Sequence, residues 1–176
     1  MLKRIGLMGL LLILLTGISR GGPLDDAMFK IGGGGFATSD QVQTGDVAGV
    51  LVASVLLPVY WNICLEGDYA DLNNMGNWEN YTGKVVFFSK PPKTDEPIPY
   101  AFFAGGVTHN GNLDSLQVAM DEDKNKFGWD GGLGVQFPLF GAKWYVEGAF
   151  KRAYDQNLWM LTAGLVFDLN KPKGEP

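Results

Sequence analysis

The segment WYVEGAFKRAY, residues 144–154, carries most of its large apolar side chains at even-numbered positions and the charged side chains of Glu147 and Lys151 at odd-numbered positions. Trp144, Val146 and Phe150 alternate with Glu147 and Lys151. Because side chains two apart on a β-strand share a face, the pattern predicts a strand with one apolar and one charged face. A soluble sheet turns its polar face to water, whereas a membrane β-barrel turns its apolar face to lipid and its polar face to the lumen.

The composition limits the classes of protein to which the chain can belong. Its 176 residues suffice for one domain with a core, 19% of them are charged, and the formal net charge is -5. A nucleic-acid-binding protein would show a basic stripe, so no nucleic-acid partner is expected. Cys64 is the single cysteine, which excludes an intrachain disulfide and a cysteine-based zinc site.

The N-terminal residues 1–19 have the three-part pattern of a secretory signal peptide. Two basic residues precede the apolar run 5–15, and the small residues Gly17 and Ser19 follow it. The run is shorter than the ~20 residues that a membrane-spanning helix needs. We predict cleavage after Ser19, with a later site near Ala27 as the alternative.

The rest of the chain predicts strands, because alternating apolar segments are separated by turn residues and no helical period persists. Eight strands are expected, at residues 28–37, 47–57, 60–71, 81–89, 100–109, 127–137, 144–154 and 158–169. They would form one domain over residues 28–169, preceded by a linker at 20–27 and followed by a polar tail at 170–176.

The alternation is clear in most of these strands but fails in one. In the eighth strand, Leu161 and Leu165 oppose Thr162 and Asp168. Residues 47–57, VAGVLVASVLL, are apolar on both faces, so the facing of this strand stays open.

The connections alternate in length, as in outer-membrane barrels, which have short turns at one end and longer loops at the other. The connections after the second strand, at Pro58, and after the sixth, at 138–143, are tight. Those after strands one, three and five are mostly longer, and 110–126 is the longest. The short connection near 155–157 departs from the trend.

Aromatic side chains gather at the predicted strand ends. Membrane barrels carry such residues at both interfaces, since an amphipathic ring is most stable between hydrocarbon and headgroups. Trp78 is expected in the loop after the third strand. The expected interface aromatics are Trp61, Tyr69, Tyr81, Trp129, Trp144, Tyr154 and Trp159.

Four stretches give the chain a resemblance to a known family. They are KIGGGGF at 30–36, YAFFAGGV at 100–107, residues 127–154, and LTAGLVFDL at 161–169. The chain resembles the small OmpA- and OmpX-like eight-stranded barrels of the "porin family". The resemblance implies an all-β fold, an eight-stranded antiparallel up-and-down transmembrane β-barrel in the outer membrane of a Gram-negative cell envelope. It also implies contact with outer-membrane lipid, lipopolysaccharide and the outer-membrane assembly machinery. Such barrels usually end on an aromatic residue, whereas here Phe167 is followed by Asp168, Leu169 and the polar tail.

Strand parity predicts a set of charged side chains inside the barrel. An eight-stranded barrel is just filled by side chains, and buried charges must be paired or hydrated. A salt-bridge network that plugs the lumen is therefore favoured over a conducting pore. The predicted lumen charges are Lys30, Glu66, Lys84, Asp130, Glu147, Lys151 and Asp168.

Residues for catalysis are sparse. His109 is the only histidine, and Gly111 stands where lipid A deacylases of this membrane carry a serine two residues on. No nucleophile–base set is visible, so neither an enzyme, a metal site nor a cofactor is predicted. Arg152 has outward parity at the long-loop end. It is suited either to lipopolysaccharide phosphates or to a position at the membrane interface.

The sequence thus predicts a structural or surface-interaction protein whose loops meet an unknown extracellular partner. Two alternatives remain. One is a narrow channel through a loosened lumen network. The other is a secreted soluble barrel that binds a small apolar ligand, as lipocalins do.

Overall fold

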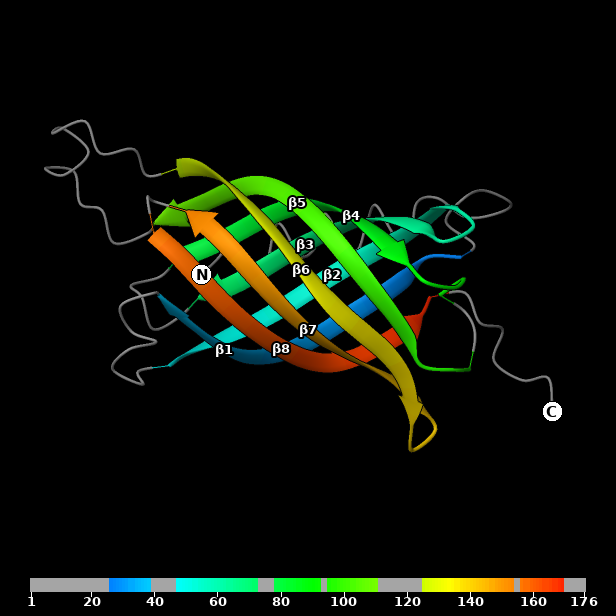
Figure 1. The fold of residues 1–176 in the computed structure, drawn as a ribbon. Helices are drawn as coiled ribbons and strands as arrows, with labels where there is room; N and C mark the ends of the chain where they lie inside the picture. The colour runs from blue at the N-terminus through cyan, green and yellow to red at the C-terminus, as the bar shows by residue number, and fades with distance from the viewer. Residues whose placement is uncertain are drawn as a thin grey trace, which may run out of the picture.

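The computed structural model is a closed barrel of eight antiparallel strands (Figure 1). It describes residues 26–38, 47–72, 78–92, 95–110, 125–153 and 156–169. The predicted signal peptide lies outside these residues, as does the cleavage site predicted after Ser19. Most of the linker, the polar tail and Tyr154 also lie outside them. No helix in the described part of the chain is long and apolar enough to span a membrane. The strands are β1 Met28–Thr38, β2 Ala48–Tyr60, β3 Ile63–Leu72, β4 Trp78–Phe88, β5 Ile98–Asn110, β6 Asn125–Leu139, β7 Ala142–Ala153 and β8 Gln156–Asp168.

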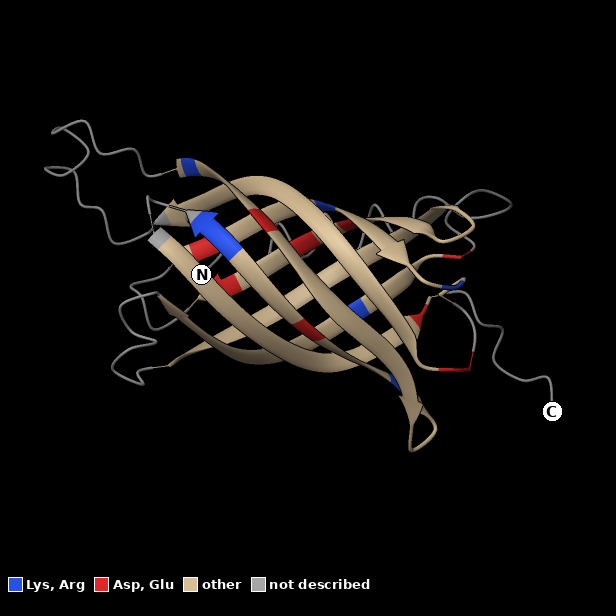
Figure 2. Cartoon of the chain, viewed as in Figure 1, with Lys and Arg blue, Asp and Glu red and all other residues tan. Residues whose placement is uncertain are grey.

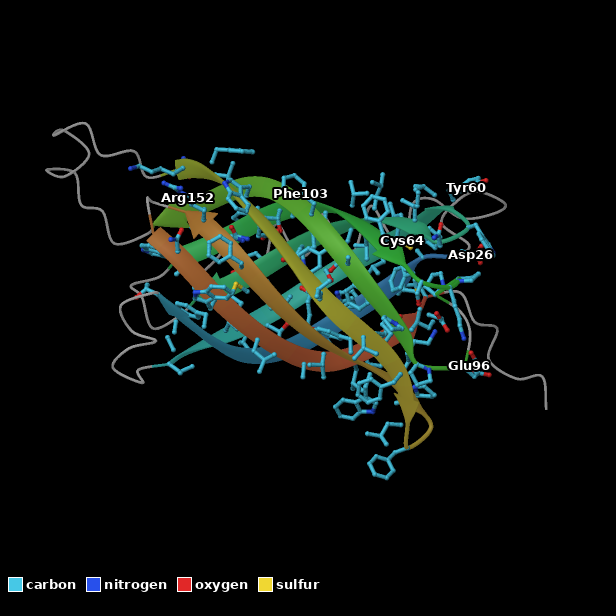
Figure 3. All side chains as sticks on the ribbon, in the orientation of Figure 1. Asp26, Tyr60, Cys64, Glu96, Phe103 and Arg152 are labelled. Atoms are coloured by element: carbon cyan, nitrogen blue, oxygen red, sulfur yellow. The ribbon has the colours of Figure 1, made fainter. Side chains whose placement is uncertain are left out.

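Each strand pairs with its neighbours in the sequence, and β8 closes the barrel on β1, where Ile31 faces Leu165. The predicted up-and-down topology is therefore confirmed. We call the end with the β2–β3, β4–β5 and β6–β7 connections the turn end, and the opposite end the loop end. Arg152 lies at the loop end, whereas Tyr60 and Glu96 lie at the turn end (Figure 3).

Two predicted connections are corrected by the structure. The sequence predicts Pro58 in the turn after β2, but this residue lies within β2 opposite Cys64, and the turn comes at Trp61 and Asn62. The register shifts between Pro58 and Tyr60, an irregularity of the kind that tolerates a residue without a backbone N–H. Trp78 is predicted in a loop, but it begins β4 and is only 7% exposed.

The polarity of the barrel wall is the reverse of that in a water-soluble barrel. Phe103 and Leu133 are 61% and 70% exposed on the outer face, whereas Lys30 and Lys151 are each 1% exposed inside. The few charged positions along the strands are shown in Figure 2. An apolar exterior around charged interior residues is the arrangement of a transmembrane β-barrel.

The burial of its side chains shows which face of β2 points into the barrel, a question that the sequence pattern left open. Val50, Val52 and Leu56 are buried inside the barrel, and the alternate residues Leu51 and Val55 face outward. Both faces are apolar because the outer one belongs to the apolar exterior and the inner one packs in apolar parts of the lumen.

Glycines make room for two inward tyrosines. A Cβ on Gly134 would lie 2.3 Å from the Tyr100 ring, and a Cβ on Gly32 would lie 2.4 Å from the Tyr145 hydroxyl. The side chains of β5 and β7 thus fill space that the neighbouring glycines leave free.

Candidate functional site

The charged cluster in the lumen is built from the cross-strand register. Glu66 on β3 lies directly opposite Lys84 on β4, and Asp130 on β6 lies opposite Lys151 on β7. Side chains opposite one another on the same face of an antiparallel pair lie close together, so each pair unites opposite charges. All four side chains are buried.

Lys30 and Lys84 share the two glutamates. Lys30 Nζ donates to Glu66 Oε1 at 2.9 Å and to Glu147 Oε2 at 3.0 Å. Lys84 Nζ donates to Glu147 Oε1 at 2.9 Å and lies 3.6 Å from Glu66 Oε1. Each glutamate is therefore in contact with both ammonium groups, which satisfies the requirement that a buried charge be paired.

Three further side chains complete this cluster, although the predicted set did not include them. Asp68 Oδ2 lies 3.6 Å from Lys84 Nζ and accepts a hydrogen bond from Thr82. The Tyr100 hydroxyl donates to Glu147 Oε2 at 2.9 Å. The Tyr145 ring lies 4.6 Å from Lys30 Nζ, within range of a cation–π contact. The alternation of side chains could have predicted two of these residues, because Asp68 lies on the same face of β3 as Glu66 and Tyr145 lies on the same face of β7 as Glu147.

Lys151 and Asp130 form a separate ion pair nearer the loop end. Lys151 Nζ lies 2.8 Å from Asp130 Oδ2, and both residues are at least 96% buried. The predicted lumen position of Asp168 is wrong: Asp168 is exposed, because β8 ends there at the rim of the barrel. The alternation of side chains predicted the face of β8 on which Asp168 lies, but not its position along the barrel axis.

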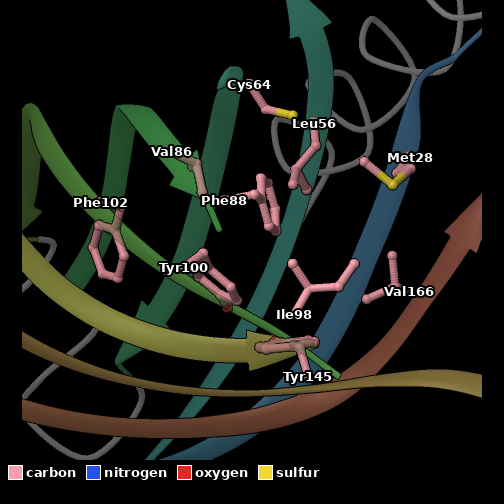
Figure 4. Close-up of a cluster of buried hydrophobic side chains, with 10 residues drawn as sticks. All are labelled: Met28, Leu56, Cys64, Val86, Phe88, Ile98, Tyr100, Phe102, Tyr145 and Val166. Atoms are coloured by element: carbon pink, nitrogen blue, oxygen red, sulfur yellow. The ribbon is translucent and has the colours of Figure 1, made fainter. Parts of the chain in front are cut away.

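A cluster of buried apolar side chains lies in the lumen on each side of the four-residue charged cluster. The cluster at the turn end is shown in Figure 4 and contains Met28, Leu56, Cys64, Val86, Phe88, Ile98, Tyr100, Phe102, Tyr145 and Val166. The cluster at the loop end contains Phe36, Ala48, Val50, Val52, Ala70, Leu72, Trp78 and Leu158. The cluster of Lys30, Lys84, Glu66 and Glu147 therefore forms a charged layer between two apolar ones, whereas the Lys151–Asp130 pair lies at the level of the loop-end cluster, where Lys151 faces Leu158.

Tyr154 lies outside the described residues, and the predicted interface aromatics Tyr69, Tyr81, Trp129, Trp144 and Trp159 lie on the outer faces of their strands. At the loop end, the Phe150 ring contacts Trp129 and Trp159, with centroid distances of 5.7 and 4.9 Å. The rings of Tyr69 and Tyr81 lie 5.3 Å apart on β3 and β4. At the turn end, Trp61 is 73% exposed, and Trp144 Nε1 donates to the Leu139 carbonyl at 3.1 Å.

The candidate residues for chemistry have structural contacts. His109 Nδ1 lies 2.8 Å from Asn125 Oδ1 on the adjacent strand. Cys64 is completely buried in the apolar cluster at the turn end. Within the described ranges, no group of three or more His, Cys, Asp or Glu side chains is arranged to hold a metal ion. Gly111 and residues 111–124 lie outside the described residues.

The architecture matches that of solved outer-membrane barrels. The N-terminal β-barrel domain of Pseudomonas aeruginosa OprF aligns with a TM-score of 0.54 at 11% identity, over 81% of this chain and 98% of that domain. The chain has the fold of the eight-stranded outer-membrane β-barrels.

A second similar structure is Ail, the attachment invasion locus protein of Yersinia pestis. It aligns with a TM-score of 0.41 at 12% identity, over 81% of this chain and 97% of Ail. No family model and no curated protein sequence matches the chain. The likeness to this barrel fold therefore rests on the arrangement of the strands rather than on shared residues.

Proposed function

We propose that this chain is a non-enzymatic structural barrel of a bacterial outer membrane, with a closed lumen and with its loop end facing the outside of the cell. One observation carries the proposal: the wall is apolar outside, while the buried charges form ion pairs inside. Lipid accommodates such an exterior, and a paired interior network holds the strands together without a solvent-filled pore.

The layered interior supports closure of the lumen. An ion crossing it would have to break the contacts of Lys30 and Lys84 with Glu66 and Glu147. It would also have to pass both apolar clusters, in which Leu56, Leu72 and other side chains are completely buried. An eight-stranded barrel is narrow enough for its side chains to fill it, so the interior supports the plugged barrel over the narrow channel.

The same polarity argues against a soluble barrel of the lipocalin type. Such a protein would keep its charges in water and line its cavity with apolar groups. Here Lys30 and Lys151 are buried, whereas Leu51 and Phe127 on the outer face are 62% and 75% exposed.

The loop end is the part proposed to meet partners outside the cell. Strand β5 ends there at Asn110 and β6 begins there at Asn125, and Arg152 is exposed on the outer face opposite Trp129 (Figure 3). A guanidinium group there suits the phosphates of lipopolysaccharide, since Arg binds phosphate through two parallel hydrogen bonds.

Fractionation of a Gram-negative host that expresses the full chain tests this proposal. We expect the mature chain in the outer-membrane fraction, extractable by detergent and absent from the soluble periplasm. A matched pair of variants strengthens the test: Phe103→Leu keeps the outer face apolar and should assemble normally, whereas Phe103→Asp should reduce the amount assembled. Recovery of the wild-type chain as a soluble periplasmic monomer would refute the membrane proposal.

A further inference from the structure

The hairpin formed by β6 and β7 extends beyond both neighbouring strands at the turn end. The register of β5 with β6 stops at Ile98 and Gln136, and that of β7 with β8 stops at Lys143 and Val166. Residues 137–142 thus lie past the last pairs that the hairpin makes with the rest of the barrel. The yellow hairpin in Figure 1 projects away from the body of the barrel.

The tip of this hairpin is apolar and has an unusual backbone. Phe140 is 93% exposed and Leu139 is 41% exposed. Phe140 and Gly141, the two residues of the turn, have φ angles of 52° and 76°. Two-residue turns with positive φ favour Asn and Gly, and a bulky residue in this region is strained. Exposure of the Phe140 ring is unfavourable in water, and its backbone conformation is one that a small polar turn residue would adopt with less strain.

The apolar tip continues the outer face of the barrel. On β6, Leu133, Val135, Phe137 and Leu139 share the outward parity, and they are all exposed or partly exposed. The tip therefore extends the surface that the proposed membrane location turns toward lipid.

The polar backbone at the tip is also partly satisfied within the protein. Trp144 Nε1 donates to the Leu139 carbonyl at 3.1 Å, so this carbonyl has a partner that is not water. Lys143 Nζ donates to the Pro92 carbonyl at 2.9 Å, which ties the base of the hairpin to the β4–β5 connection. A hairpin that is anchored at its base, and whose Leu139 carbonyl is hydrogen-bonded within the protein, is suited to an environment poor in water.

We propose that Leu139 and Phe140 form a wedge that inserts into the phospholipid leaflet at the turn end of the barrel. This inference rests on the proposed membrane location and adds a specific lipid contact outside the barrel wall. A second copy of the chain is a poorer occupant, because two side chains at a tip are far fewer than the roughly 20–30 residues per partner of a stable protein interface.

Spin labels can measure the environment of the tip in vesicles of phosphatidylethanolamine and phosphatidylglycerol. A Cys64→Ala background removes the buried thiol, and single cysteines then replace Phe140, Phe103 or Glu96. Phe103 reports the outer wall, and Glu96 is an exposed polar position at the turn end. Leu139→Cys gives a second label at the tip should the variant at position 140 not fold. The measured quantity is the collision rate of each label with oxygen, which concentrates in lipid, and with a water-soluble nickel chelate.

We expect the labels at positions 140 and 103 to collide several-fold more often with oxygen than with the nickel chelate, and the label at 96 to show the reverse. If position 140 behaves like 96 while 103 behaves like lipid, the wedge is refuted and the membrane location stands. If 103 is also accessible to the nickel chelate, the proposed membrane location fails together with the wedge. Protection of position 140 from both reagents, growing with the protein-to-lipid ratio, would refute the lipid wedge in favour of a second copy.

Discussion

Lys30 Nζ lies 3.0 Å from Glu147 Oε2, although 117 positions separate the two residues in the chain. They belong to β1 and β7, and β8 lies between these strands in the closed barrel. Glu66 on β3 approaches the same ammonium to 2.9 Å. One lysine thus links three strands through the lumen, a contact that exists only after the barrel has closed.

Removing Glu147 should destabilise the barrel strongly. Glu147→Leu removes the carboxylate that accepts hydrogen bonds from Lys30, Lys84 and Tyr100, and breaking buried ion pairs in this way costs about 3–5 kcal/mol. Glu147→Gln should cost less, about 1–3 kcal/mol, because the amide can still accept a hydrogen bond. The carboxylates of Glu66 and Asp68 remain beside the two lysines in both variants, so the difference between the variants measures the hydrogen bonding at position 147. Reversible unfolding in lipid vesicles measures both, with the exposed Glu96→Gln as the control. Equal costs for the two substitutions would show that hydrogen bonding at position 147 adds nothing to its charge, and costs as small as that of the control would contradict the role of the charge.

The pair formed by Lys151 and Asp130 should show strong non-additivity. Each single substitution, Lys151→Met or Asp130→Leu, leaves a buried unpaired charge and should cost about 3–5 kcal/mol. The double variant replaces the pair with apolar side chains and should be more stable than either single variant. A double-mutant cycle measured by unfolding in vesicles checks this order. Additive costs would show that the two charges are solvated separately.

A charge on the outer face should be costly in the membrane. Phe103→Lys should cost about 2–4 kcal/mol if position 103 lies near the bilayer midplane. Phe150→Lys should cost less, because Phe150 contacts Trp129 and Trp159, which we assign to the interface at the loop end. Vesicle unfolding of both variants, beside Phe103→Leu and Phe150→Leu, separates the effect of charge from that of lost packing. Tolerance of both lysines would mean that this face does not meet lipid.

Two glycines offer a matched test of packing. A Cβ at Gly134 would collide with the Tyr100 ring, which is buried and hydrogen-bonded to Glu147. Gly134→Ala should therefore cost about 1–3 kcal/mol. Gly83 faces outward, and a Cβ there would meet no other atom within 4 Å, so Gly83→Ala should be neutral or stabilise by up to about 1 kcal/mol. Thermal unfolding of the two variants in detergent gives the comparison. The reverse order would contradict the packing of Tyr100 on Gly134.

The strands and their faces could be predicted because parity is a local property. The alternation of Trp144, Val146 and Phe150 with Glu147 and Lys151 suffices to assign two faces to β7. Parity failed for residues 47–57 because both environments of that strand are apolar. It placed Asp168 on the correct face but not at the exposed rim, since depth depends on where neighbouring strands end.

The partners within the lumen could not be predicted from local patterns. The contacts of Lys30 with Glu66 and Glu147 depend on the register of every strand pair and on closure of the barrel. Trp78 shows the same limitation: its loop-like surroundings in the sequence gave no sign that it begins β4 and packs inside the barrel.

Planar-bilayer conductance of the purified, refolded protein tests the closed lumen most directly. The layered interior predicts no steady ion current from the wild-type barrel at moderate voltage. A control variant, Glu147→Ala combined with Lys84→Ala, removes two side chains of the charged layer and shows whether the interior responds to loosening. Steady, reproducible current steps from the wild-type protein would contradict the closed lumen and identify the barrel as a channel.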